Sequence, residues 1–178
     1  MQGIVSLLDG ADRERIEQLW DELRRDFGVQ GIHAKRFPHF SYHVAQEYDL
    51  RRTRNKLESL ARQTGTFLVQ TSGIGVFTRK QPVVYVPVVR APELELLREK
   101  VASLAASAAT EINEYYVSDI WIPHITIAEG DVDLLVLPEI IRRFGERTFR
   151  WEIGVTNFAL IRATEDVQEV CFRCDFGA

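Results

Sequence analysis

Two four-residue motifs in this chain combine a histidine with a hydroxyl residue. They are Pro38-His39-Phe40-Ser41 and Pro123-His124-Ile125-Thr126, and both follow the order proline, histidine, large apolar residue, hydroxyl residue. The flanking sequences favour strands, in which residues i and i+2 lie on one face about 6–7 Å apart. Each motif therefore presents an imidazole and a hydroxyl together and buries its apolar residue. Two such strands brought together would surround a small anion with two imidazoles and two hydroxyls.

A pair of imidazoles is suited to proton transfer at a phosphate ester. Breaking a phosphodiester, or opening a cyclic phosphate, needs a base for the nucleophile and an acid for the leaving oxygen. Histidine serves in either role because its unperturbed pKa is about 6.5. We therefore expect His39 and His124 to be the catalytic pair, in either assignment, and Ser41 and Thr126 to bind the phosphate oxygens. The alternative is two structural histidines, which suits a single histidine better than a matched pair.

A third histidine follows the first motif on the same predicted strand. Alternation places His43 on the face of His39 and Ser41, and we expect it at the cleft edge as a candidate substrate contact. A shared metal ion is disfavoured because His39 and His43 would be about 13 Å apart along the strand, whereas Zn–N bonds are about 2.0–2.1 Å. No acidic residue falls between them. We expect neither a metal nor a cofactor.

Aromatic and basic side chains supply further candidate contacts for a nucleotide. Phe77 and Tyr85 lie on the two strands of one predicted hairpin and could stack on a base. Arg79 lies in the connection of that hairpin and could contact a phosphate, although surface arginines are usually solvated. Weaker candidates of the same kinds are expected in the core or in solvent: Tyr115, Tyr116, Trp121, Lys80, Lys35 and Arg36.

Composition limits the class of protein. The 178 residues suffice for one domain, and the net charge of -4 argues against coating long or duplex nucleic acid. The apolar runs are too short to span a membrane, and the first residues do not resemble a signal peptide. The two cysteines, Cys171 and Cys174, would point to opposite faces of a strand, so neither a redox nor a zinc pair is expected. We expect a cytoplasmic monomer.

The order of predicted elements repeats within this single domain, 1–178. Each histidine motif is followed by a helix and then by strands, which predicts an internal repeat over roughly 38–90 and 123–175. Each half is expected to form its own antiparallel sheet, with helices packed on one face. Pro138 is expected to kink or split a helix over about 132–144. The other expected helices span about 12–27 and 50–63, and one begins at Pro92.

These residues resemble the two-histidine phosphoesterase superfamily, which includes bacterial 2'-5' RNA ligases and RNA 2',3'-cyclic phosphodiesterases. The hallmark of that family is two His-x-Thr/Ser motifs on strands, separated by roughly half the chain. The stretch 72–77 also resembles the family's glycine-containing strand that ends in phenylalanine. The resemblance implies a bilobal α+β fold, with two pseudo-symmetric antiparallel sheets forming a concave cleft and helices on the outer faces. Ser41 departs from the commoner threonine and lacks the methyl that restricts χ1.

The resemblance implies a metal-independent phosphoesterase that acts by two-histidine acid–base catalysis. Its substrate would be a 2',3'-cyclic phosphate or a 2'-5' phosphodiester at the end of an RNA or in a small nucleotide, hydrolysed or reversibly ligated. One alternative is a binding module of the same fold that recognises a nucleotide or RNA end without turnover. Another is a metal-dependent hydrolase, which would need a carboxylate near His39 that the sequence does not offer.

Overall fold

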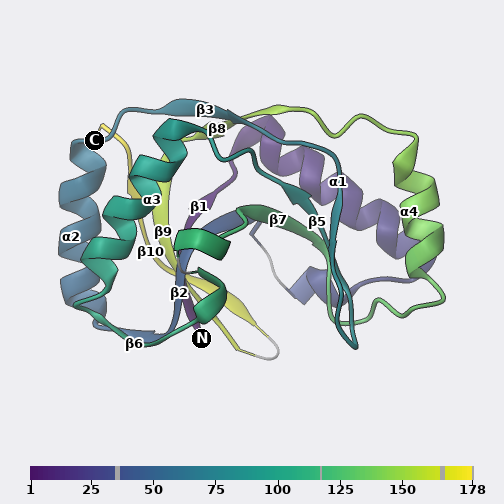
Figure 1. The fold of residues 1–178 in the computed structure, drawn as a ribbon, viewed down its shortest axis with the longest axis horizontal. Coiled ribbons are helices and arrows are strands. Elements are labelled where there is room, and N and C mark those ends of the chain that lie inside the picture. Colours follow the sequence, from purple (N-terminus) through teal and green to yellow (C-terminus); the bar gives the residue numbers. More distant parts are fainter. Residues whose placement is uncertain (35–36, 117, 165–166, 178) are drawn as a thin grey trace.

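The computed structural model describes residues 1–34, 37–116, 118–164 and 167–177. Lys35 and Arg36, two of the weaker basic candidates, lie outside these ranges. Helices are interspersed with single strands and hairpins along the chain (Figure 1). The strands are β1 (Gln2–Leu7), β2 (His39–Tyr48), β3 (Phe67–Gln70), β4 (Gly75–Phe77), β5 (Val83–Pro87), β6 (Ala109–Ile112), β7 (His124–Ala128), β8 (Glu152–Val155), β9 (Asn157–Ala163) and β10 (Gln168–Asp175).

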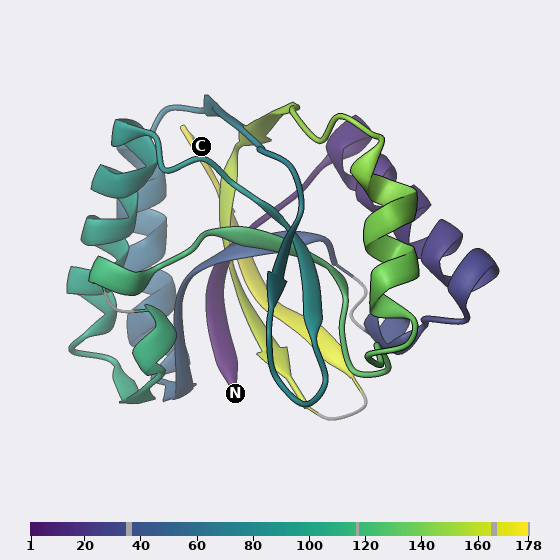
Figure 2. The same cartoon turned by 45° about the vertical axis from the view of Figure 1, so that its right-hand side comes forward.

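The helices follow the apolar spacing of the sequence. They are α1 (Gly10–Phe27), α2 (Leu50–Arg62), α3 (Pro92–Ala105) and α4 (Leu137–Gly145), with 3₁₀ turns η1 (Gly31–Ala34), η2 (Glu114–Tyr116) and η3 (Ser118–Ile120). In α1, the residues Ile16, Leu19, Trp20 and Leu23 form the buried stripe that packs towards the core. Helices α2 and α3 lie together on one side of the strands, and α1 and α4 lie on the other (Figure 2).

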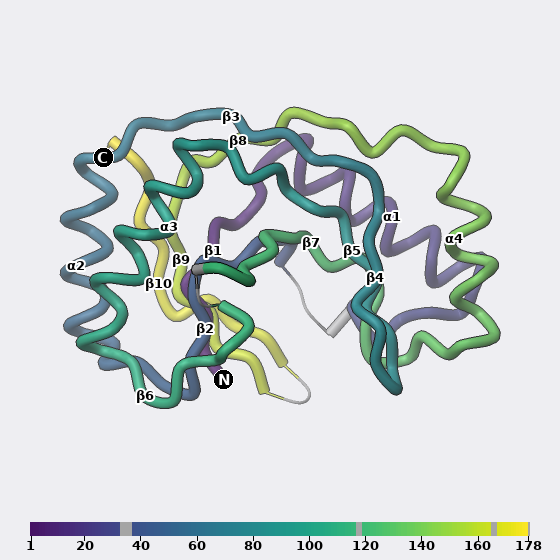
Figure 3. Tube along the Cα trace, viewed as in Figure 1, coloured from purple at the N-terminus to yellow at the C-terminus, as the bar shows by residue number. Residues whose placement is uncertain are grey.

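The strands form three antiparallel sheets within the described residues. The orders are β10-β9-β1-β2-β6, β4-β5-β7 and β3-β8. The expected α+β class with antiparallel sheets is confirmed. The motif strands β2 and β7 belong to different sheets but contact each other (Figure 3). The two histidine motifs are therefore brought together by the meeting of two sheets.

The sheets mix the two halves of the chain, which corrects the expectation that each half forms its own. Hairpin β4-β5 from the first half pairs with β7 of the second. Hairpin β9-β10 from the second half continues the sheet that contains β1 and β2. Alternating hydrophobicity specifies which face of a strand is buried but not which strand lies beside it. The order β2-α2-β3-β4-β5 does recur as β7-α4-β8-β9-β10.

The start of α4 differs from the sequence expectation for a local reason. Helix α4 begins at Leu137, so Pro138 lies in its first turn instead of kinking it. Proline fits there because its missing N–H has no intrahelical partner at that position. The preceding turn is closed by Asp133, whose Oδ1 accepts hydrogen bonds from the backbone N–H groups of Leu135 and Val136.

In the described part of the chain, no helix is both long and apolar enough to cross a membrane.

Asn157 fixes the end of β1 beside the first motif. Its side chain accepts from the Leu7 N–H at 3.1 Å and donates to the Leu7 carbonyl at 2.9 Å. Leu7 is the register partner of His39. The amide of Asn157 thus supplies both a donor and an acceptor where a further strand residue would otherwise pair.

Replacement of Asn157 by leucine is expected to lower the free energy of unfolding by about 3 kcal/mol, because two buried backbone groups lose their partners. Urea unfolding of the purified chain measures this. Asn55→Leu on the exposed face of α2 is the matched control and should change stability by less than about 0.5 kcal/mol. Equal effects of the two replacements would contradict the role given to Asn157.

Candidate active site

Both motifs line one cavity of about 670 Å³. His39 and Ser41 reach it from β2, and His124 and Thr126 reach it from β7. All four side chains are partly exposed, whereas Phe40 and Ile125 between them are fully buried. The expected alternation within each motif is therefore present. The structure brings the two imidazoles and the two hydroxyl residues to a single hollow.

The motif strand β2 carries a bulge immediately after its hydroxyl residue. Ser41 pairs with Val5, and the next paired residue, His43, pairs with Ile4. Tyr42 is therefore the additional residue on β2. A bulge interrupts the ladder and bends the strand that contains it.

The same bulge occurs in β7. Thr126 pairs with Tyr85, and the next paired residue, Ala128, pairs with Val84, which leaves Ile127 as the additional residue. Burial follows the same pattern over 39–44 and 124–129. The first, third and sixth residues are partly exposed, and the second, fourth and fifth are buried. The two motifs thus share one local backbone design.

The two imidazoles make the same hydrogen bond. His39 Nδ1 lies 2.6 Å from the Phe37 carbonyl, and His124 Nδ1 lies 2.7 Å from the Ile122 carbonyl. A carbonyl can only accept, so each Nδ1 carries the proton. In the neutral ring this tautomer places the lone pair on Nε2. Both histidines are therefore set to exchange a proton through Nε2.

The carbonyl of each motif proline accepts a hydrogen bond from the residue that directly follows the neighbouring strand. The Pro38 carbonyl accepts from the Leu8 N–H at 2.9 Å, and the Pro123 carbonyl accepts from the Val88 N–H at 2.9 Å. Proline has no N–H of its own and restricts the residue before it to extended conformations. Each proline therefore holds the preceding carbonyl, the acceptor of the imidazole, in a defined place.

The expected cleft-edge position of His43 is wrong. His43 is only 3% exposed, does not line the cavity and shares a hydrogen bond of 2.5 Å with the Tyr48 hydroxyl. The bulge at Tyr42 causes this, because it shifts the alternation by one residue and turns His43 inward. Val44 lines the cavity instead. The expected position of His43 rested on regular strand alternation, and no residue type in the motif indicates a bulge.

The two candidate aromatic contacts have different places. Phe77 lines the cavity and stacks on Tyr85 with ring centroids 4.1 Å apart. Tyr85 is 8% exposed and does not line the cavity, which corrects its expected direct contact with substrate. Both rings pack against the imidazole of His124, at centroid distances of 4.9 and 5.1 Å. Gly75 makes room for this stack, since a Cβ there would lie 2.4 Å from the Tyr85 ring.

Arg79 lines the cavity, as expected, and forms an ion pair with Glu129. Its guanidinium donates to Glu129 at 2.8 Å and to the Gln81 carbonyl at 2.9 Å, and Glu129 also lines the cavity. A phosphate that approaches Arg79 would compete with this carboxylate. Lys80 is exposed and is not among the described residues that line the cavity.

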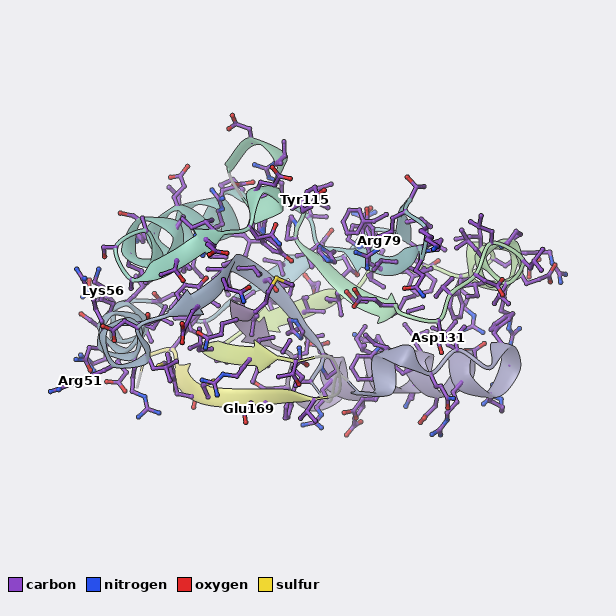
Figure 4. The ribbon with its side chains drawn as sticks, turned by 90° about the horizontal axis from the view of Figure 1, so that it is seen from below. Arg51, Lys56, Arg79, Tyr115, Asp131 and Glu169 are labelled. Atoms are coloured by element: carbon purple, nitrogen blue, oxygen red, sulfur yellow. The ribbon has the colours of Figure 1, made fainter. Side chains whose placement is uncertain are left out.

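Turn η2 contributes two tyrosines that the sequence indicated only as weaker candidates, expected in the core or in solvent. The side chain of Tyr115, labelled in Figure 4, is 69% exposed. Both Tyr115 and Tyr116 line the cavity. Burial raises the pKa of Tyr116, and its hydroxyl interacts with Ser41. The turn is docked on β2 by a bond from the Asn113 N–H to the Val44 carbonyl at 2.9 Å. Both tyrosines precede the second motif in sequence. No local pattern predicts that they lie beside the first motif in space.

Cys171 and Cys174 are both free thiols. Within the described residues, no group of three histidine, cysteine, aspartate or glutamate side chains is arranged to hold a metal ion.

A sequence model of the 2'-5' RNA ligase superfamily matches residues 11–167. The chain belongs to this superfamily. A relative from Bacillus anthracis, provisionally named a phosphoesterase, is 26% identical over 148 residues, which cover 78% of this chain and 81% of that protein.

Solved structures show the same fold. The protein TT0787 of Thermus thermophilus has a TM-score of 0.66 at 17% identity, and the match covers 99% of this chain and 98% of that one. Escherichia coli LigT complexed with 3'-AMP has a TM-score of 0.59 at 18% identity, with 98% and 97% covered. The sequence model confirms the expected superfamily, and the solved structures agree with the expected α+β class.

The buried His43 is expected to make stability depend on pH. Burial, together with the positive charge of Arg98, lowers the pKa of His43 to about 4. The unfolded chain has the ordinary histidine pKa of about 6.5, so it takes up the proton first as pH falls. The free energy of unfolding should therefore be highest above that pH, and this residue should lower it by about 2 kcal/mol between pH 7 and pH 5.

Urea unfolding at pH 7 and pH 5 measures the change, and His43→Phe is the comparison. The variant should lose less stability than the wild type between the two pH values, whatever its absolute stability. Identical pH dependence in both proteins would show that His43 does not carry the effect.

Proposed function

We propose that this protein is a metal-independent phosphoesterase with two-histidine acid–base catalysis. Its substrate is a 2',3'-cyclic phosphate, or a 2'-5' phosphodiester, at the end of an RNA or in a small nucleotide. The observation that supports this most is the matched Nδ1–carbonyl bond of His39 and His124 at one cavity. Two imidazoles in the same tautomer suit a reaction that removes one proton and supplies another.

In hydrolysis of a cyclic phosphate, one Nε2 accepts a proton from water as the water oxygen attacks phosphorus. The bond from phosphorus to one ribose oxygen breaks, and the other histidine, protonated, gives its Nε2 proton to that oxygen. The product is a phosphomonoester, and the pair ends with its protonation states exchanged. When a 5'-hydroxyl attacks in place of water and the 3'-oxygen leaves, the same transfers form a 2'-5' linkage. Either histidine can be the base.

Ser41 and Thr126 are proposed to donate hydrogen bonds to the non-bridging phosphate oxygens. Neutral donors placed before the reaction stabilise charge that develops in the transition state, without reorganising solvent. Both hydroxyl residues share the face of their histidines, on strands that contact each other. The phosphate would lie between β2 and β7.

The ring of Phe77 in the cavity wall suits stacking on a nucleobase. Phe77 lines the cavity and is supported from behind by Tyr85, and base–aromatic stacking is worth about 1–3 kcal/mol. Structures of Escherichia coli LigT have been solved with 3'-AMP, NADP+ and ATP, which supports a nucleotide as the ligand of this cavity. A binding module without turnover is the second candidate, and the matched imidazoles favour the enzyme.

Replacing either catalytic histidine with glutamine should lower kcat for a 2',3'-cyclic nucleotide by about 10²- to 10⁴-fold, because each removes one proton transfer. Activity is measured by chromatography of the phosphomonoester product, in the presence of a chelator. The wild type should turn over under these conditions, with a bell-shaped pH dependence of kcat/KM. Thermal unfolding of the His39→Gln and His124→Gln variants should resemble that of the wild type.

Near-normal turnover by either variant would contradict the paired role. Binding of the nucleotide without hydrolysis would favour the binding module, and hydrolysis that the chelator abolishes would favour a metal-dependent hydrolase.

Phe77→Ala should raise KM for a 2',3'-cyclic nucleotide by about tenfold, the loss of one stacking contact. Phe77 also packs on His124, so kcat can change as well. Ribose 2',3'-cyclic phosphate, which has no base, separates the effects because its KM should hardly change. An equal rise in KM for both substrates would show that Phe77 does not bind the base.

A further inference from the structure

Two tryptophans bond to the hydroxyl residues of the motifs. The indole N–H of Trp121 donates to the Ser41 carbonyl at 2.9 Å, and the indole N–H of Trp20 donates to the Thr126 carbonyl at 3.2 Å. Tryptophan has one side-chain donor and no acceptor, and when buried it needs a partner. Trp121 is fully buried and Trp20 is 5% exposed.

Each indole reaches a stretch of motif strand that is paired on one side and, among the described strands, has no neighbour on the other side. Strand β7 is at the edge of its sheet, and β6 pairs with β2 only from Ala45 onward. The accepting carbonyls also belong to the residues directly before the bulges at Tyr42 and Ile127. The indoles therefore take the place of a ladder hydrogen bond at the point where the strand is least constrained.

The connections are crossed between the halves. Trp121 lies three residues before His124, in the segment that leads into β7, but it holds β2. Trp20 lies on α1, in the segment between β1 and β2, but it holds β7. Moving one motif strand relative to the other would break at least one indole bond. The two bonds together therefore constrain the separation of the motifs.

The Trp121 ring is itself held in place. It stacks on Tyr42 with ring centroids 6.4 Å apart, and the guanidinium groups of Arg90 and Arg98 lie 5.9 and 5.7 Å from its centroid. Trp20 belongs to the buried stripe of α1, packs in the core and also lines the cavity. The indole donors are thus fixed by packing and can transmit that order to the backbone they bind.

We propose that Trp20 and Trp121 are positioning residues, which act through Thr126 and Ser41 and set the spacing of the two motifs across the cavity. The inference rests on the proposed function, in which these hydroxyls bind the phosphate. Because the carbonyl and the hydroxyl belong to the same residue, releasing the carbonyl releases the hydroxyl as well. A misplacement of about 1 Å in such a group can cost about 10²-fold in rate.

Crossed double-mutant cycles test the proposal on hydrolysis of a 2',3'-cyclic nucleotide. Trp121→Phe and Trp20→Phe should each lower kcat by about 10- to 100-fold. The loss from Trp121→Phe should shrink to less than about twofold in a Ser41→Ala background and persist in a Thr126→Ala background, because only the first removes the group it positions. Trp20→Phe should behave in the opposite way. Trp151→Phe, the third tryptophan of the chain, is the matched control and should keep wild-type activity.

Losses that multiply equally in both backgrounds would overturn the proposal and leave a general packing role. If phenylalanine prevents folding, the Trp151→Phe protein can be produced with β-(3-benzothienyl)alanine at positions 20 and 121. This residue keeps the ring shape and lacks the N–H, so the rate should fall as in the phenylalanine variants. An unchanged rate would refute the role of the indole bonds.

Hydrogen exchange separates this proposal from the proposed function, since it needs no turnover. Trp121→Phe should speed amide exchange in 39–44, and Trp20→Phe should speed it in 124–129. A wild type that hydrolyses none of the substrates would refute the function and leave this readout valid. Faster exchange confined to the segment next to each replaced tryptophan in sequence would overturn the crossed bracing.

Discussion

The site depends on a hydrogen bond from each imidazole to the carbonyl two residues before it. The bonds of His39 and His124 use the same atoms, at distances of 2.6 and 2.7 Å. The intervening proline restricts the residue before it and offers no N–H that would compete. Each histidine therefore obtains a defined tautomer from a carbonyl of its own motif segment. The rest of the fold has only to bring two such units to one cavity.

The exchange of hairpins between the sheets is what brings them there. Each motif strand shares its sheet with a hairpin from the other half of the chain: β7 with β4 and β5, and β2 with β9 and β10. The site therefore lies where the two sheets meet, and neither half contains a complete site. The bulges after Ser41 and Thr126 bend both strands at this meeting point.

Several residues at the site are positioned by long-range contacts, which local sequence patterns do not predict. His43 was expected at the cleft and is buried, because one additional residue in β2 reverses the face it presents. Tyr85 was expected to touch substrate and instead supports Phe77 and His124 from behind. Tyr116 and Trp121 reach Ser41 from far along the chain. Spacing along a strand predicts faces only while the ladder is regular.

Residue types and local spacing are enough to indicate the chemistry available to this protein. Two proline–histidine motifs with matched hydroxyls, the alternation within each, the α+β class and the family all follow from residue types and local spacing. The folded chain, in contrast, fixes the cavity that both motifs share, the pairing of the strands, the direction of His43 and the tryptophan bonded to each motif. The difference is one of range. Rotamers, turns and strand faces are set by neighbours in sequence, whereas sheet pairing and side-chain contacts across the core are set by the packing of the whole chain.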